Sequence, residues 1–257
     1  MNKLEENLGK GFAETTGSLR LYWLGGAGFI VKSSEVTIGI DLYLSNACMG
    51  EDGAFKRLTP SPVSPENLRL DWLIASHEHG DHLDTGSIHK LLSPNGATRL
   101  ICPTTTKAQA LLQGVDASRI VELNRGQSAD YKGFSIRAVL ADHGDGSPDA
   151  IGFFLTVAGK VIYFMGDTCF RTDLAHHVAP PDTIDGLLVP INGRYGNPDG
   201  REAAYFAQMF KPKAAIPCHY WLFMEHGGDP GAFVECCGRI APNTEAKVLA
   251  IGEGMAL

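Results

Sequence analysis

The sequence predicts an α/β (α+β) protein in which a two-layered β core is covered by helices. Short runs rich in β-branched, aliphatic and aromatic residues recur along the 257 residues, separated by Gly, Pro, Asn or Asp. Helical segments are fewer and are interspersed with these runs. No long linker divides the chain, so we expect a single domain over 1–257. Its two halves, about 1–125 and 126–257, are similar in make-up.

The expected strands are apolar segments bounded by turn-forming residues. In the first half they cover 19–24, 29–32, 36–42, 72–75, 99–101 and 120–123. In the second half they cover 134–140, 151–157, 161–165, 186–189, 214–216 and 247–251. Strands of this length separated by helices favour a layered arrangement.

The expected helices have recognisable start or stop signals. Asp84 is an N-cap candidate for 85–92, and Pro230 suits the first turn of 230–240. Gly114 follows the helix 105–112, and Pro212 follows the helix 201–210. A short helix is expected at 65–68.

The net charge of the chain bears on whether it binds nucleic acids. The chain has 22 Lys and Arg against 29 Asp and Glu, a net charge of −7. We therefore expect no binding of long nucleic acids. No apolar run approaches the ~18 residues of a membrane helix, and the first ten residues are polar, so we expect a cytoplasmic protein without a membrane partner. The six cysteines form no CxxC pair and are expected to be reduced.

The segment Ser76-His77-Glu78-His79-Gly80-Asp81-His82-Leu83-Asp84 is the strongest functional signal. Imidazole and carboxylate groups are ligands for Zn, Mn or Fe. His77 and His79 are two residues apart and point the same way on an extended segment. Gly80 lets the chain turn, so Asp81 and His82 approach from another side. The segment can therefore supply two neighbouring metal positions.

Three further candidates follow predicted strands. His143 comes after 134–140, Asp167 after 161–165 and His219 after 214–216. Each alone is a weak signal, but they share one placement, the carboxyl end of a strand, where loops build sites. Histidine ligands also need an acceptor for the second ring nitrogen, and the candidates for this support are Asp41, Asp84 and Asp142.

This order and spacing resembles the metallo-β-lactamase superfamily. The resemblance implies a four-layer αββα sandwich with the site at one edge, and Asp41 supporting the metal loop. It also implies two metal positions: one held by His77, His79 and His143, the other by Asp81, His82 and His219, with Asp167 bridging.

Within the superfamily the chain is most similar to the L-ascorbate-6-phosphate lactonase-like group. The similarity rests on Trp23-Leu24-Gly25, the 76–84 segment, Gly166-Asp167-Thr168, the segment 191–197 and Pro217-Cys218-His219-Tyr220. It implies one or two divalent ions, with Mn favoured, Zn next and Fe compatible. It also implies a small anionic, sugar-acid phosphate-like substrate and is compatible with a homo-oligomer. The chain is shorter than a typical lactonase, and Gly25-Gly26-Ala27 lacks a histidine that many relatives carry.

The expected activity is metal-dependent opening of a lactone or ester by hydroxide. Asp81 either orients the nucleophile or shuttles a proton in addition to binding metal, or is a ligand alone. Asn192, Arg194 and Tyr195 are the candidate substrate-binding residues, with Arg194 suited to an anion. The residues that follow His219 are candidates for the pocket wall, or equally for the core or a subunit interface: Tyr220, Trp221, Phe223 and His226. Two alternatives remain open: a phosphodiesterase of the same superfamily, and a metal-binding protein without turnover.

Overall fold

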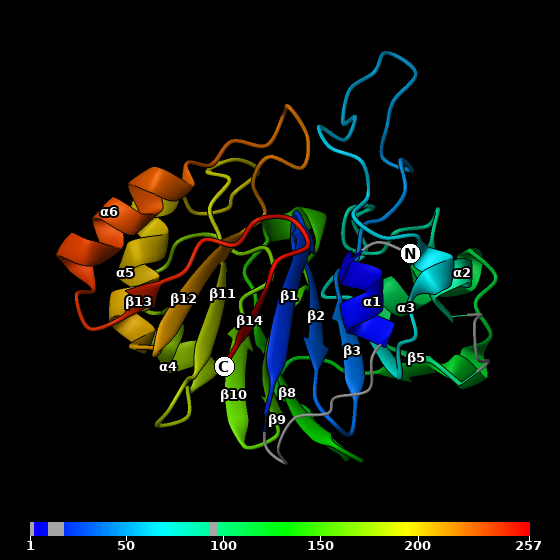
Figure 1. The fold of residues 1–257 in the computed structure, drawn as a ribbon, viewed down its shortest axis with the longest axis horizontal. Helices are drawn as coiled ribbons and strands as arrows, with labels where there is room; N and C mark the ends of the chain where they lie inside the picture. The colour runs from blue at the N-terminus through cyan, green and yellow to red at the C-terminus, as the bar shows by residue number, and fades with distance from the viewer. Residues whose placement is uncertain (1–2, 10–17, 93–96) are drawn as a thin grey trace.

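Two seven-stranded sheets face each other in the computed structural model, which describes residues 3–9, 18–92 and 97–257. Helices cover the outer face of each sheet, so the molecule has four layers in the order αββα (Figure 1). The fold class predicted from the sequence is confirmed.

The first sheet has the strand order β14-β1-β2-β3-β4-β5-β6. Its strands are β1 (Arg20–Gly25), β2 (Gly28–Lys32), β3 (Thr37–Ile40), β4 (Trp72–Ile74), β5 (Arg99–Cys102), β6 (Ile120–Glu122) and β14 (Gly254–Ala256). Pairing is antiparallel from β14 to β3 and parallel from β3 to β6. The helices on its outer side are α1 (Lys3–Gly9), α2 (Ile88–Leu92) and α3 (Thr104–Leu112).

The second sheet has the order β13-β12-β11-β10-β9-β8-β7. Its strands are β7 (Ser128–Tyr131), β8 (Phe134–Leu140), β9 (Ile151–Val157), β10 (Lys160–Phe164), β11 (Gly186–Pro190), β12 (Ala214–Cys218) and β13 (Glu245–Ala246). Pairing is antiparallel from β7 to β10 and parallel from β10 to β13. Its helices are α4 (Leu174–Val178), α5 (Gly200–Phe210) and α6 (Pro230–Ile240).

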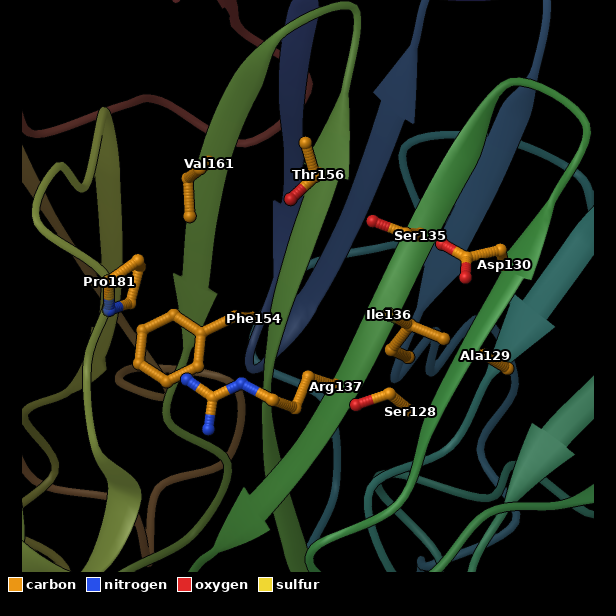
Figure 2. A pocket seen from close by; sticks show the side chains of 10 residues that line it. All are labelled: Ser128, Ala129, Asp130, Ser135, Ile136, Arg137, Phe154, Thr156, Val161 and Pro181. Carbon is orange, nitrogen blue, oxygen red and sulfur yellow. The ribbon is translucent and has the colours of Figure 1, made fainter.

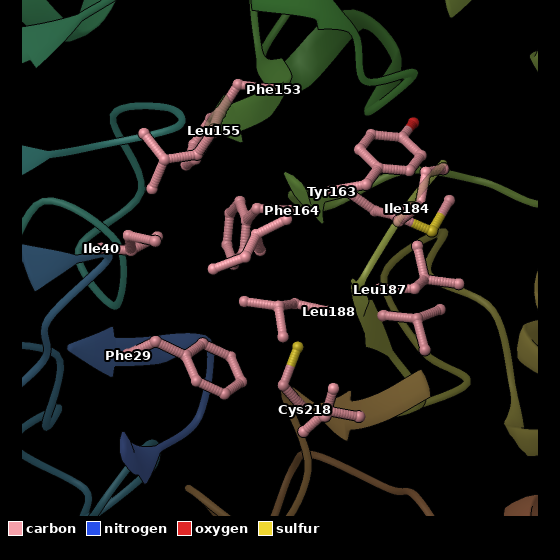
Figure 3. Close-up of a cluster of buried hydrophobic side chains, with 14 of the residues drawn as sticks. Phe29, Ile40, Phe153, Leu155, Tyr163, Phe164, Ile184, Leu187, Leu188 and Cys218 are labelled. Carbon is pink, nitrogen blue, oxygen red and sulfur yellow. The ribbon is translucent and has the colours of Figure 1, made fainter. Parts of the chain in front are cut away.

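The main core lies between the two sheets. Figure 3 shows Phe29 and Ile40 of the first sheet facing Phe164 and Leu188 of the second, all fully buried. Phe153 stacks on Phe164 with ring centroids 5.1 Å apart. Burial of this apolar surface, at about 25 cal/mol per Å², is the main force that holds the sheets together.

Helix termini agree with local sequence signals. At the start of α5, the carboxylate of Asp199 accepts hydrogen bonds from the N–H groups of Arg201 and Glu202 (both 2.9 Å). Glu202 in turn accepts from the N–H of Asp199, which completes a capping box. The helix α6 starts similarly, with the N–H of Ala232 donating to Asp229.

Some predicted boundaries are wrong. The strand expected at 247–251 does not form, because β13 ends at Ala246 and β14 begins at Gly254, with a turn between them. The helix expected at 85–92 begins only at Ile88, and the one at 65–68 is a single 3₁₀ turn, Pro65–Asn67. The strand β7 and the helices α1 and α4 were not predicted.

Among the helices in the described part of the chain, none has both the length and the apolar character needed to cross a membrane.

The strand directions bring distant residues to one edge. β3 and β4 run parallel in the first sheet, and β8, β10 and β12 share one direction in the second. The segments that follow these strands contain Asp41, His77, His143, Asp167 and His219.

Candidate metal centre

Three histidine rings converge after β4 and β8. His77 Nε2 lies 2.9 Å from His79 Nδ1, and His143 Nε2 lies 3.2 Å from the same atom. His77 is fully buried, whereas the other two rings reach the surface of a pocket. Ring nitrogens this close, from two separate strands, form a set that could hold one ion.

A second group is formed by Asp81, His82 and His219. His82 Nε2 lies 3.0 Å from His219 Nε2, and His219 Nε2 lies 3.3 Å from Asp81 Oδ2. The N–H groups of His82 and Leu83 both donate to the carbonyl of His79 (2.9 and 2.8 Å). This turn presents Asp81 and His82 from a different side than the two preceding histidines, as the spacing predicted.

Asp167 lies between the two groups. Its Oδ2 is 3.8 Å from His143 Nε2, and its Oδ1 is 3.4 Å from His82 Nε2 and 3.3 Å from His219 Nε2. Oδ1 is buried and accepts no hydrogen bond from any described residue, whereas Oδ2 accepts one from the side-chain amide of Asn197 (2.7 Å). A buried carboxylate oxygen with a free lone pair, aimed at two imidazoles, fits a metal ligand.

Asp41 supports the histidine segment from behind. Its Oδ2 accepts from His82 Nδ1 (2.6 Å) and from the Ser76 hydroxyl (2.6 Å), and its Oδ1 accepts from the Ser76 N–H (2.7 Å). The Ser76 hydroxyl in turn accepts from His77 Nδ1 (3.0 Å). Both histidines therefore keep Nε2 available for an ion. Asp41 and His219 adopt left-handed φ angles of 43° and 59°, a conformation that costs energy and is typical of functional sites.

The electrostatics favour neutral imidazoles on one side and ionised carboxylates in the middle. Burial lowers the pKa of His77 and of His143. Burial alone raises the pKa of Asp167, but His219 and His82 outweigh it and hold that pKa well below its usual value. Burial opposes protonation of His82 as well, yet neighbouring carboxylates, Asp167 first, raise its pKa. A bound cation would supply the positive charge that the proton on His82 supplies beside these carboxylates.

The family comparison agrees with this geometry. The family described as "Beta-lactamase superfamily domain" matches residues 41–220, a range that contains all seven candidate ligands. The chain belongs to the metallo-β-lactamase superfamily.

Relatives within this superfamily carry hydrolase names. A "UPF0173 metal-dependent hydrolase" of Carboxydothermus hydrogenoformans is 28% identical over 93% of this chain and 100% of its own length. A protein of the same name from Methanopyrus kandleri is 29% identical over 91% of this chain and 98% of its own. The lactonase-like subgroup is not distinguished by these relatives.

Solved structures share the metallo-β-lactamase fold. Igni18, a metallo hydrolase of Ignicoccus hospitalis, matches with a TM-score of 0.74 and 21% identity, over 93% of this chain and 98% of that one. An isothiocyanate hydrolase from Delia radicum gut bacteria matches with a TM-score of 0.73 and 18% identity, again over 93% and 98%. At these identities the likeness concerns the fold.

In this metallo-β-lactamase fold, a pocket of about 620 Å³ opens beside the two groups of ligands. The candidate ligands that line it are His79, Asp81, His143, Asp167 and His219. The other side chains of its wall are Cys48, Phe55, Tyr195, Phe223 and His226. A smaller pocket of about 220 Å³ lies across β7 to β10, where Arg137 packs on Phe154 (Figure 2), and it contains none of the seven candidate ligands.

The predicted substrate-binding residues are placed differently from one another. Tyr195 lines the pocket and is about half exposed. Asn192 is buried outside the lining, where its amide donates to the Arg194 carbonyl (3.3 Å). Arg194 is exposed and is not among the lining residues.

Two expected supporting aspartates serve other purposes. Asp84 accepts from the N–H groups of Leu44 and Ser45 (2.8 and 2.9 Å) and thereby ties the histidine segment to the loop after β3. Asp142 accepts from Arg171 (2.7 Å). Of the three candidates, only Asp41 contacts a candidate ligand histidine among the described residues.

Sequence reasoning missed several residues of the site. Cys48 and Phe55 come from the long β3–β4 loop, which projects beyond the sheets in Figure 1 and carries no local signal for a pocket. A Cβ atom at Gly80 would lie 2.8 Å from Cys48 Sγ. Gly80 therefore gives the Cys48 side chain room to approach, and its backbone does not adopt a left-handed conformation.

His226 lies near the second ligand group. Its ring stacks on His219 with centroids 4.6 Å apart, and its Nε2 is 3.8 Å from Asp81 Oδ2. Burial, followed by the neighbouring His219, lowers the pKa of His226 to about 3, so the ring is neutral. The sequence marked it only as a residue of the pocket wall.

Proposed function

We propose that this protein is a metal-dependent hydrolase that opens a lactone or ester. The observation that carries the proposal is the meeting of seven imidazole and carboxylate groups from four separate segments, with the Asp167 carboxylate between two clusters. The hydrolase names of the relatives that span nearly the whole chain support the same reaction class.

In this proposal one divalent ion is held by His77 Nε2, His79 Nδ1 and His143 Nε2. A second would be held by Asp81, His82 and His219, and Asp167, which lies between the two groups, could serve both ions. Mn is our first expectation and Zn the second, since the mixed nitrogen and oxygen ligands suit both. The buried lone pair of Asp167 Oδ1 and the opposed ring nitrogens support this assignment.

Bound divalent ions supply hydroxide at neutral pH and polarise a substrate carbonyl. The protein's own groups hold that chemistry in place. Asp41 fixes His82 with Nδ1 protonated, and Asn197 fixes the Asp167 carboxylate through Oδ2. Asp81 reaches the pocket surface with 15% of its side chain exposed, so it is placed to orient a water molecule or to hold a proton as well as to bind an ion.

The test begins with metal analysis of the purified protein. After removal of metal by a chelator, Mn or Zn is restored, and lactones, carboxylic esters and bis-p-nitrophenyl phosphate are assayed side by side. His77→Ala and Asp167→Asn should lose metal and turnover together. His176→Ala changes an exposed histidine on α4 and should retain both.

The outcomes separate the alternatives. Turnover of lactones or esters that depends on restored metal supports the proposal. Turnover of the phosphodiester alone would replace it with phosphodiesterase activity, and a metal-loaded protein inert toward all three substrate classes would favour binding without catalysis. Full activity in both ligand variants would refute the assignment of the site.

A further inference from the structure

We infer that the pocket selects a substrate whose non-reacting part is uncharged and carries an aromatic or branched apolar group. This inference rests on the proposed hydrolase function and specifies its substrate class. It departs from the anionic substrate expected from Arg194. The reason is the chemistry of the pocket wall that Phe55, Tyr195, Phe223 and His226 form.

That wall is a cluster of aromatic rings, in which Tyr195 is about half exposed and Phe223 is almost fully buried. Phe55 packs edge-on against Phe223 (ring centroids 5.6 Å) and lies 6.3 Å from the Tyr195 ring. The rings of Phe223 and Tyr195 both lie next to the ring of His226, with centroid distances of 4.8 and 6.1 Å. His226 in turn stacks on His219. A substrate held with its carbonyl at the ligands therefore meets aromatic rings with the rest of its body.

Two exposed methionines are chain neighbours of residues that line the pocket. Met49 follows Cys48 in the chain, and Met224 follows Phe223; their side chains are 46% and 74% exposed. Large apolar side chains in water are costly to maintain and mark binding surfaces when they gather near a pocket. Methionine in particular adapts to ligands of irregular shape.

No lysine or arginine lines the pocket among the residues that the structure describes. Arg194, next to Tyr195 in the chain, is exposed and is not among the lining residues. Arg57 donates to the carbonyls of Tyr43 and Thr59, and Lys56 lines a different cavity. A carboxylate or phosphate on the far end of a substrate would thus lose water against aromatic rings, with no lysine or arginine among the described lining residues to pair with.

The aromatic wall and the lack of lysine or arginine among the described lining residues favour uncharged substrates over anionic ones. A phenyl group gains from burial against the wall, whereas a carboxylate in the same position loses hydration. The net charge of −7 adds repulsion for anions at a distance. We expect a difference of at least about tenfold in kcat/KM, since burial of a ring of this size is worth more than one factor of ten.

The decisive comparison uses two lactones that differ in one substituent. γ-Phenyl-γ-butyrolactone and γ-carboxy-γ-butyrolactone share the ring and the reacting carbonyl. With metal restored, the wild-type protein should hydrolyse the phenyl lactone with the higher kcat/KM. Equal kcat/KM values, or a preference for the carboxy lactone, would overturn the inference while leaving the hydrolase function intact.

A matched pair of variants assigns the preference to the wall. Phe55→Lys places a cation inside the pocket and should reduce the ratio of phenyl to carboxy turnover at least about tenfold. Leu58→Lys adds the same charge to the same loop, but Leu58 is exposed and does not line this pocket, so the ratio should stay within about twofold of wild type. Equal ratios in the two variants would contradict a role for Phe55.

A binding measurement keeps the inference testable without turnover. Benzylacetone and levulinate are matched ketones that carry a phenyl and a carboxylate group. Saturation-transfer NMR should show contact to the phenyl protons of benzylacetone in wild type and Leu58→Lys, and strong loss of it in Phe55→Lys. If benzylacetone binds this way but no lactone or ester is hydrolysed, the hydrolase proposal fails and the pocket inference stands. If levulinate binds equally well, the inference fails.

Discussion

Replacing Asp41 with asparagine isolates the support that this carboxylate gives to the metal centre. Asparagine has nearly the same shape and tolerates the left-handed φ of 43° that Asp41 adopts. The change therefore leaves the backbone in place and removes the negative charge and one acceptor oxygen.

The structure gives the size of the effect. Asp41 accepts from Ser76 N–H, Ser76 hydroxyl and His82 Nδ1 at 2.6 to 2.7 Å. An asparagine has a single acceptor oxygen, and its NH₂ group would face a donor, so at least one charge-assisted bond is lost, worth about 1.5–3 kcal/mol. Part of this loss falls on the orientation of His82. We expect metal affinity to fall about 10- to 100-fold, the range found when a ligand's supporting group is removed.

The assay is competition with a chelator of known affinity, which gives Kd for the restored ion. Asp84→Asn is the matched control, because Asp84 is also a buried carboxylate but accepts from backbone N–H groups of Leu44 and Ser45 and contacts no described histidine. Asp84→Asn should lower the urea midpoint and leave Kd within about twofold. If Asp41→Asn binds metal like wild type, or Asp84→Asn weakens binding equally, the reasoning is refuted.

The remaining predictions concern the centre and the fold. Asn197→Ala removes the donor to Asp167 Oδ2 and should weaken metal binding about tenfold in the same chelator assay; unchanged affinity would contradict a positioning role. Gly152→Ala places a Cβ 2.7 Å from the Met165 carbonyl and should destabilise by about 1–3 kcal/mol in urea unfolding, whereas Gly238→Ala, with open space in α6, should stabilise by about 0.5–1 kcal/mol. Lysine partners lower the pKa of Asp185 despite its burial, so its contribution to stability is present above the unfolded-state pKa and lost as pH falls toward the folded-state value. Below about pH 4, the free energy of unfolding of Asp185→Asn should therefore fall less steeply with decreasing pH than that of the wild type. An equal slope in the two proteins would count against this role of Asp185.

The parts of the fold that the sequence predicted are those with strong apolar runs. β9 is buried at nearly every position and was recognised with its observed bounds. β7, with the sequence Ser-Ala-Asp-Tyr, has low strand propensity and exists because it pairs with β8 across a two-residue turn at Lys132-Gly133. The segment 247–251 is the converse case, because it is apolar but forms no strand. It connects the two sheets and pairs with neither as a strand.

The candidate site divides in the same way. The ligand candidates could be found because three histidines and an aspartate fall within residues 77–82, and because the other candidates share one placement after predicted strands. The aromatic wall could be found only in part. Phe223 and His226 follow His219 in the chain and were candidates for the wall, whereas Phe55 looks like an ordinary core residue. The fold brings the two loops together through the N–H of Leu58, which donates to the carbonyl of Leu222. Which aspartate supports which histidine was also beyond sequence, since it depends on the three-dimensional approach of Asp41 to His82.

The last strand of the described chain has a consequence for biosynthesis. β13 belongs to the second sheet, but β14 returns to the first and pairs antiparallel with β1, Tyr22 opposite Gly254 (Figure 1). On the ribosome, the edge of β1 stays open until residues 254–256 have emerged from the exit tunnel. The sheet that contains β1 is therefore completed only after every strand of the other sheet has been translated.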